Sequence, residues 1–310
     1  MISDLFSVTV LIGILASGIR LATPYLYASI GETFGQRSGV LNLGVEGQML
    51  LGAFAAFYVT LTTGNLWLGV LTAMFVGAAM GLAMAYVTVS LNAEQGISGI
   101  GFFLFGLGMS DLLFQKLMGT VETVKGFPKV YIPGLSDIPG IGEIFFSQNV
   151  LVYGAYLLVP VAWFVLNKTT LGLKIRSVGE NPDAADSLGV SVAHIRYFTL
   201  ILGGTLSGIA GASLSIALLN VFQQNMTSGL GFIAVALVYF GAWRPIGVLA
   251  GALLFSMINS LQLWIQVLGI PVPSDIAVMM PYVLTILVLV ATVSRVRAPS
   301  ALTKPFEREN

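Results

Sequence analysis

Residues that could bind a solute lie between positions 32 and 48, in a part of the chain that is otherwise apolar. Glu32 and Glu46 fall within apolar runs, where an ionised carboxylate costs several kcal/mol unless it is paired or hydrated. Arg37 lies between them, and one interpretation is that it pairs with Glu46 to fix the reversal between two helices. The other is that Asn42, Glu46 and Gln48 face a polar pathway and bind hydroxyl groups or a base edge of the solute. Both interpretations stay open.

Two further residues belong with these candidates. Phe232 could stack on a flat base, although an aromatic side chain in a membrane helix more often faces lipid or packs in the core. Asp111 lies in an apolar run and is followed by Lys116. For Asp111 a structural pairing, with Lys116 or with a neighbouring helix, is the favoured interpretation.

The chain carries few residues for catalysis or metal binding. It has one histidine, His194, and no cysteine, which excludes disulfides, a thiolate nucleophile, Cys-ligated zinc and every motif that needs two histidines. It also lacks the G-x-x-x-x-G-K-[ST] loop that binds nucleotide phosphates. We therefore expect no catalytic site, no metal site and no cofactor bound by this chain.

Composition places the chain in a membrane. Of 310 residues, 56% are hydrophobic and 9% are charged, whereas a soluble domain carries about 25% charged residues. The 14 Lys and Arg balance the 14 Asp and Glu, so there is no basic surface for nucleic acid. The 36 glycines suit closely packed membrane helices, and G-x-x-x-G pairs are candidate packing faces at 77 and 81, 204 and 208, and 247 and 251.

The uncharged stretches predict ten membrane-spanning helices. Crossing the hydrocarbon takes about 20 apolar residues as helix, so the stretches 47 to 93 and 197 to 243 each hold two spans. Turn residues divide them at 62 to 65 and at 220 to 229. The expected spans, of which the second and eighth are short, are 3 to 19, 20 to 34, 40 to 62, 66 to 91, 97 to 118, 148 to 167, 197 to 219, 228 to 241, 245 to 268 and 276 to 296. The predicted fold class is an all-α polytopic membrane protein.

The basic residues orient these spans, because short loops rich in Lys and Arg stay in the cytoplasm. An even number of spans puts both termini on one side, together with Arg37, Lys168, Lys174, Arg176, Arg196, Arg244, Arg295, Arg297, Lys304 and Arg308. The other side keeps Arg20, Lys116, Lys125 and Lys129. We therefore expect both termini in the cytoplasm. Five spans on each side of the long outer loop would give two inverted halves. The first apolar run lacks the features of a cleaved signal and is expected to be a retained helix.

The chain is expected to be one transmembrane domain over residues 1 to 310, with three segments outside the bilayer. Residues 119 to 147 form an extracytoplasmic loop, 168 to 196 a cytoplasmic loop and 297 to 310 a cytoplasmic tail. In the cytoplasmic loop, Asn181 can cap a helix, Pro182 suits its first position and Gly189 can close it. This helix either joins two spans or protrudes to contact a cytoplasmic partner.

Four segments carry a resemblance to a known family. Residues 172 to 190, GLKIRSVGENPDAADSLGV, resemble the coupling loop of permease subunits from bacterial ABC importers, in the superfamily of ribose and branched-chain amino acid permeases. Residues 31 to 49, GETFGQRSGVLNLGVEGQM, resemble the early motif of its simple-sugar and nucleoside branch. The runs GFIAVAL at 231 with RPIG at 244, and PYVLT at 281, are similar to later motifs.

The resemblance implies a translocation subunit in the bacterial inner membrane that is not an enzyme. A separate cytoplasmic ATPase would bind ATP and Mg, an extracytoplasmic binding protein would deliver the solute, and a second, related permease would complete the pore, a heterodimer being favoured. The residues that it assigns to coupling are Gly172, Arg176, Gly179, Glu180, Asn181, Pro182, Ala184, Ala185 and Gly189. The pathway or structural cluster comprises Glu32, Arg37, Asn42, Glu46, Gln48 and Phe232.

Nucleosides are the favoured solute, because residues 31 to 49 resemble that subgroup. A simple-sugar ABC permease is the alternative within the same family. A secondary transporter is the alternative from a different class, since inverted halves and intramembrane carboxylates also occur there. A membrane enzyme or a simple channel fits less well.

Overall fold

The computed structural model describes residues 7 to 269, 273, 279 to 280, 283, 286 to 287, 290 and 297 to 307. These residues are helical, apart from two isolated β-bridges and the connecting segments. The elements are α2 (Val8–Arg37), α3 (Val45–Thr63), α4 (Leu66–Ala85), η1 (Tyr86–Ser90), α5 (Gln95–Leu117), α6 (Ile141–Phe145), α7 (Val150–Lys168), α8 (Thr170–Glu180), α9 (Pro182–Ser187), α10 (Val192–Ser213), η2 (Leu214–Leu218), α11 (Leu230–Phe240) and α12 (Pro245–Val267).

Seven helices within the described residues are long and apolar enough to cross a membrane. The predicted all-α polytopic class is therefore confirmed. Most of the expected spans after residue 40 match a helix to within several residues. The expected span from 276 to 296 and the motif from 281 to 285 fall largely outside the described residues.

The prediction of two spans over 3 to 34 is wrong, because α2 is one helix of 30 residues. The expected spans 3 to 19 and 20 to 34 meet at Arg20, but Arg20 lies inside α2. A single arginine can extend its apolar stem along a helix and leave the helix intact. Pro24 also lies within α2. Beyond Pro24 nearly every residue as far as Gln36 is buried, so packing holds this half of the helix.

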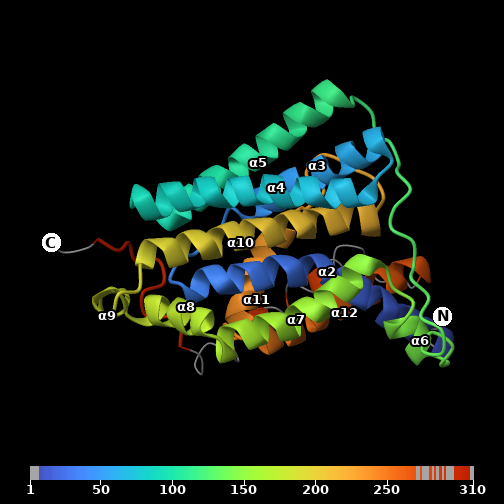
Figure 1. Ribbon diagram of the computed structural model, residues 1–310. Helices are drawn as coiled ribbons and strands as arrows, with labels where there is room; N and C mark the ends of the chain where they lie inside the picture. Colours follow the sequence, from blue (N-terminus) through green and yellow to red (C-terminus); the bar gives the residue numbers. More distant parts are fainter. Residues whose placement is uncertain are drawn as a thin grey trace.

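The single helix changes the predicted topology. The start of α2 and residues 297 to 307 lie at opposite ends of the helix bundle (Figure 1), so the prediction that both ends of the chain share one side is wrong for the described residues. Four long helices, α2, α3, α4 and α5, precede the connecting segment that contains α6. The first half thus lacks the fifth span that two five-helix halves require.

Helices α4 and α10 pack through the predicted glycine faces. A Cβ atom added to Gly77 would lie 2.1 Å from the carbonyl oxygen of Gly204, and one added to Gly204 would lie 2.2 Å from that of Gly77. Gly81 lies against Leu200 and Gly208 against Ala73 in the same way. Backbones in direct contact explain why these four positions carry no side chain.

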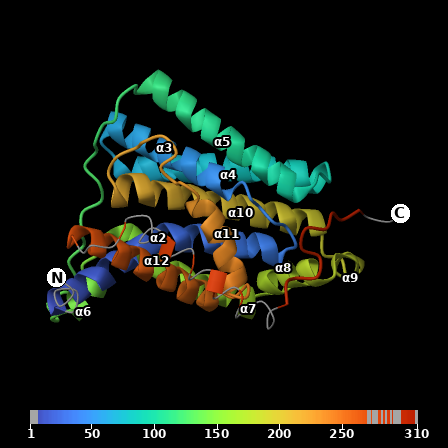
Figure 2. The same cartoon turned by 180° about the vertical axis from the view of Figure 1, so that it is seen from behind.

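Helix α11 differs from its neighbours in length and direction. Its 11 residues span about 16 Å at 1.5 Å per residue, about half of the hydrocarbon thickness. It runs across α2 on one side of the bundle, from the level of α10 toward that of α12 (Figures 1 and 2). Short helices of this kind are typical of transport proteins, where a broken helix presents its end inside the membrane.

Candidate coupling and translocation site

The predicted short helix of the coupling loop is confirmed as α9, following directly on α8. The side chain of Asn181 accepts a hydrogen bond from the backbone nitrogen of Ala184 at 3.1 Å, and Pro182 occupies the first turn. Gly189 follows with φ +81°, a left-handed conformation that favours glycine. At the other end of α8, Thr169 caps the helix by accepting from the backbone nitrogen of Gly172. Local capping thus builds this region.

Some side chains of α9 face the helix bundle and others face solvent. Ala185 is only 2% exposed and packs on the hydrophobic core, whereas Ala184 is exposed. Leu188, just after α9, is 85% exposed. Ala184 and Leu188 are therefore the side chains of this segment that are open to contact, and Ala185 seats α9 on its own chain.

The last turn of α8 meets the end of α2 backbone to backbone. A Cβ atom on Gly179 would lie 2.1 Å from the carbonyl oxygen of Arg37. Gly172 is equally tight, because its Cβ would lie 2.1 Å from the carbonyl oxygen of Val165. The Nε of Arg176 donates to the Gly172 carbonyl at 3.4 Å. Both glycines thus set the distance of α8 from its neighbours.

Residues 297 to 307 are bound to the same region. The backbone nitrogen of Ala301 donates to the Gly179 carbonyl at 2.9 Å, and that of Thr303 donates to the Gly39 carbonyl at 3.2 Å. Ser300 donates its hydroxyl to the carboxylate of Glu180 at 3.2 Å. The C-terminal segment therefore packs against the coupling region, which the sequence did not predict.

Glu46 caps α11. Its two carboxylate oxygens accept the backbone N–H groups of Gly229 at 2.7 Å and Gly231 at 2.5 Å, and the residue is 1% exposed. The positive end of a helix dipole and its unpaired N–H groups stabilise a carboxylate in this position. This contact explains how a charge is buried here. The predicted pairing with Arg37 is wrong, and the carboxylate does not face an open pathway in this conformation.

Arg37 instead holds the other end of α11. Its Nε donates to the carbonyl oxygen of Trp243 at 3.0 Å. The indole nitrogen of Trp243 donates to Oε1 of Gln36 at 2.7 Å. The sequence analysis missed both Gln36 and Trp243, although Gln36 lies inside the quoted run from 31 to 49.

The remaining polar residues of this run form one buried network. Oε1 of Glu32 accepts from Nε2 of Gln36 at 2.9 Å and from the backbone nitrogen of Asn42 at 3.0 Å. Asn42 donates its amide to Oε1 of Gln48 at 3.3 Å, and its own oxygen accepts from the backbone nitrogen of Gly44. All four side chains are at most 2% exposed. They hold the segment between α2 and α3.

Phe232 is the predicted pathway residue that remains accessible. It is 36% exposed and meets Phe103 of α5 edge to face, with ring centroids 5.1 Å apart. Phe232 directly follows Gly231, whose backbone N–H binds the carboxylate of Glu46 at the start of α11. An accessible aromatic pair beside a helix N-terminus can stack on a flat ring.

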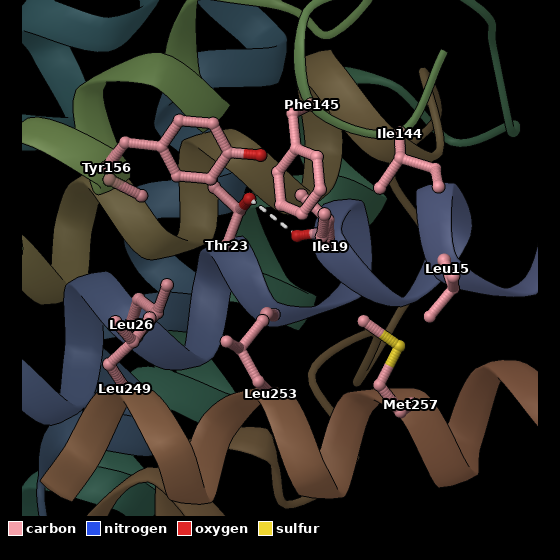
Figure 3. A pocket seen from close by; sticks show the side chains of 12 residues that line it. Leu15, Ile19, Thr23, Leu26, Ile144, Phe145, Tyr156, Leu249, Leu253 and Met257 are labelled. Atoms are coloured by element: carbon pink, nitrogen blue, oxygen red, sulfur yellow. Dashed lines mark hydrogen bonds between the residues drawn. The ribbon is translucent and has the colours of Figure 1, made fainter. Parts of the chain in front are cut away.

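A separate apolar cavity lies between α2, α6, α7 and α12 (Figure 3). Its volume is about 350 Å³, and residues such as Ile19, Leu253 and Met257 line it. The hydroxyl of Tyr156 lies among them and has no hydrogen-bond partner within the part of the chain that the structure describes. Because nearly all of the lining is apolar, this cavity does not suit a polar solute.

Among the described residues, no group of three or more His, Asp or Glu side chains is placed to hold a metal ion. His194 lies at the start of α10, where its Nδ1 is 2.6 Å from the hydroxyl of the capping Ser191.

A comparison with protein families identifies the family of this chain. The family described as branched-chain amino acid transport system / permease component matches residues 14 to 289. The chain belongs to this family. No solved structure gives a significant match.

Similar curated permeases cover nearly the whole chain. The putative glucose ABC transporter permease protein TsgC13 of Haloferax volcanii is 39% identical over 96% of this chain and 98% of its own length. The guanosine ABC transporter permease protein NupQ of Bacillus subtilis is 38% identical over 92% of this chain and 93% of its own. The nucleoside ABC transporter permease protein NupC of Lactococcus lactis is 38% identical over 93% and 94%. The chain is therefore similar to nucleoside and sugar ABC permeases.

A second, less similar permease is found in the same organism as each of these three relatives. The guanosine ABC transporter permease protein NupP of Bacillus subtilis is 26% identical over 83% of this chain. The nucleoside ABC transporter permease protein NupB of Lactococcus lactis is 25% identical over 76%. Each organism thus has one permease close to this chain and one more distant.

Proposed function

We propose that this permease carries nucleosides inward across the bacterial plasma membrane as one subunit of an ATP-binding cassette importer. The observation that carries the proposal is the match, over more than nine-tenths of the chain, to two permeases named for guanosine and for nucleosides. The accessible pair Phe103 and Phe232 supports a solute with a flat ring. A simple sugar is the second candidate, because the glucose relative is equally similar.

The end of the bundle that carries α8 and α9 is proposed to lie in the cytoplasm. The helix ends and connections at this end hold most of the cations, namely Arg37, Lys168, Lys174, Arg176, Arg196, Arg244, Arg297 and Lys304. Short segments rich in such residues stay on the cytoplasmic side. The start of α2 then lies outside, and an ATPase subunit that binds ATP and Mg docks on Ala184 and Leu188.

The second permease is proposed to be a different chain. The paired relatives support a heterodimer, because each organism has one permease near 38% identity and one near 25%. A binding protein would deliver the solute to the opposite face. Purification of the assembled importer with two copies of this chain and no second permease would contradict the heterodimer.

The solute can be tested in vesicles that contain this permease, its companion permease, the ATPase and the binding protein. We expect ATP-dependent uptake of radiolabelled guanosine that unlabelled nucleosides compete away and glucose does not. Uptake of glucose with no competition by nucleosides would transfer the proposal to simple sugars.

A further inference from the structure

Helix α11 is joined to the coupling region by a short chain of direct contacts. We propose that Trp243 is a positioning residue through which movement of α8 and α9 reaches α11, so that α11 moves when the ATPase engages. This inference rests on the proposed function, since it names the element that the ATPase moves. It is argued from the contacts at both ends of α11 and at the end of α2.

The first contact in the chain joins α8 to α2. Gly179, in the last turn of α8, leaves no space for a Cβ atom against the carbonyl oxygen of Arg37. Two backbones in contact cannot absorb a displacement as two flexible side chains would, because closely packed interiors transmit strain. A shift of α8 therefore shifts the last turn of α2. The C-terminal segment ties the same two elements, since Ala301 binds Gly179 and Thr303 binds Gly39.

The second contact joins α2 to α11. Two residues in the last turn of α2 bind Trp243. Gln36 accepts a hydrogen bond from the indole nitrogen, and Arg37 donates one to the carbonyl oxygen. Trp243 is 3% exposed, and its ring packs on Tyr239 of α11 at 4.8 Å between centroids. Trp243 thus fastens the end of α11 to the end of α2.

The turn that carries Trp243 is itself a constrained connection. Ala242 and Trp243 both have φ +54°, so two successive residues with side chains adopt the left-handed conformation. Such a conformation persists only when surrounding contacts hold it, and it is found at switch regions. Gly241 and Gly247 pack backbone to backbone across this turn, with a Cβ on Gly247 only 2.3 Å from the Gly241 carbonyl. The turn is therefore a compact joint between α11 and α12.

The opposite end of α11 provides the fixed point. Glu46 of α3 holds it through the N–H groups of Gly229 and Gly231. A short helix that is held at one end and pulled at the other rotates about the held end. Phe232, which follows Gly231 and packs on Phe103, would change its position relative to α5 as α11 rotates.

The test compares two indole hydrogen bonds that both end on α2. Trp243→Phe removes the N–H that binds Gln36 together with part of the indole ring, and Trp264→Phe makes the same change in α12, where the lost N–H donates to Ser17 at 3.2 Å. In vesicles with the complete importer we expect Trp243→Phe to raise the ATP hydrolysed per solute transported by about threefold, in line with the loss of one hydrogen bond. Trp264→Phe should leave this ratio at the wild-type value. A wild-type ratio in Trp243→Phe would overturn the inference.

Two further measurements cover the case in which Trp243→Phe does not assemble. Gln36→Leu removes the same hydrogen bond from the other side, together with the hydrogen bond from Gln36 to Glu32. The double variant should therefore show the same ratio of ATP to solute as Gln36→Leu alone, because the bond to Trp243 is already lost. In addition, the chain has no cysteine, so spin labels can be placed at Ala236→Cys in α11 and Leu71→Cys in α4. We expect the distance between these labels to change when vanadate traps the ATPase. An unchanged distance would overturn the inference, whereas a wild-type importer without ATP-dependent uptake would overturn the proposed function beneath it.

Discussion

The carboxylate of Glu46 in α3 accepts the backbone N–H of Gly231 in α11 at 2.5 Å, across 185 positions of sequence. The same carboxylate accepts from Gly229. The buried carboxylate thus accepts hydrogen bonds from backbone N–H groups at the start of a short helix. This relationship gives Glu46 a structural role.

Glu46→Gln should destabilise the permease. The amide keeps one oxygen but turns a donor toward one of the two N–H groups, and a buried N–H without an acceptor costs about 1–3 kcal/mol. The expected result is a lower midpoint of thermal unfolding in detergent. Glu32→Gln is the matched control, because a single oxygen of Glu32 accepts both of its hydrogen bonds. A loss in Glu32→Gln as large as in Glu46→Gln would contradict the capping role.

Leu188→Asp should weaken binding of the ATPase without destabilising the permease. Leu188 is 85% exposed, so the fold gains nothing from its side chain, and surface changes of this kind usually alter stability by about 0.5 kcal/mol or less. Co-purification of the two subunits measures the binding. Ala185→Leu should behave in the opposite way, because Ala185 is buried and overpacking costs about 1–3 kcal/mol. Full recovery of the ATPase with Leu188→Asp would show that this surface is not the docking site.

Gly77→Ala should separate α4 from α10. Its new methyl group would meet the Gly204 carbonyl oxygen at 2.1 Å, and forcing such a group into a packed interface costs about 1–3 kcal/mol. Gly101→Ala is the control, since a Cβ there meets nothing within 4 Å. Thermal unfolding of the two variants checks the difference, and equal midpoints would refute the predicted backbone contact.

The start of α5 should respond to pH through Glu94. The backbone N–H groups of Ile97 and Gly96 bind this carboxylate and hold its pKa below the usual value. A lowered pKa in the folded state means that the cap is intact above the unfolded pKa and is lost as the pH falls through the folded pKa. We therefore expect amide exchange at Gly96 and Ile97, corrected for the intrinsic effect of pH, to accelerate below the ordinary glutamate range. Glu94→Gln should abolish this dependence, and an identical profile in the variant would disprove it.

Local features of this fold could be predicted from the sequence. Asn181, Pro182 and Gly189 specify the helix α9 because capping depends on residues within one or two turns. The glycine pairs at 77 and 81 and at 204 and 208 were candidate faces for close packing, since two glycines one turn apart leave room for a neighbouring backbone. Length and charge were enough to place most spans.

The partners of the polar residues could not be predicted, because they are distant in sequence. Gln36 and Trp243 are 207 positions apart, and no local pattern marks either of them. The division of α2 into two spans came from taking the charge of Arg20 as a boundary, although Arg20 lies inside the helix. Whether a charged residue can lie within such a helix depends on the neighbouring helices that bury its side chain. One such error changes the number of spans by one and moves the start of α2 to the other end of the bundle.

The energy source of transport is the most direct test of the account. Nucleoside uptake should be measured in vesicles that contain the complete importer, with ATP inside or absent and with vanadate or an uncoupler added. We predict uptake that requires ATP, stops with vanadate and persists with the uncoupler. Uptake without ATP that collapses with the uncoupler would contradict the account and would indicate a secondary transporter.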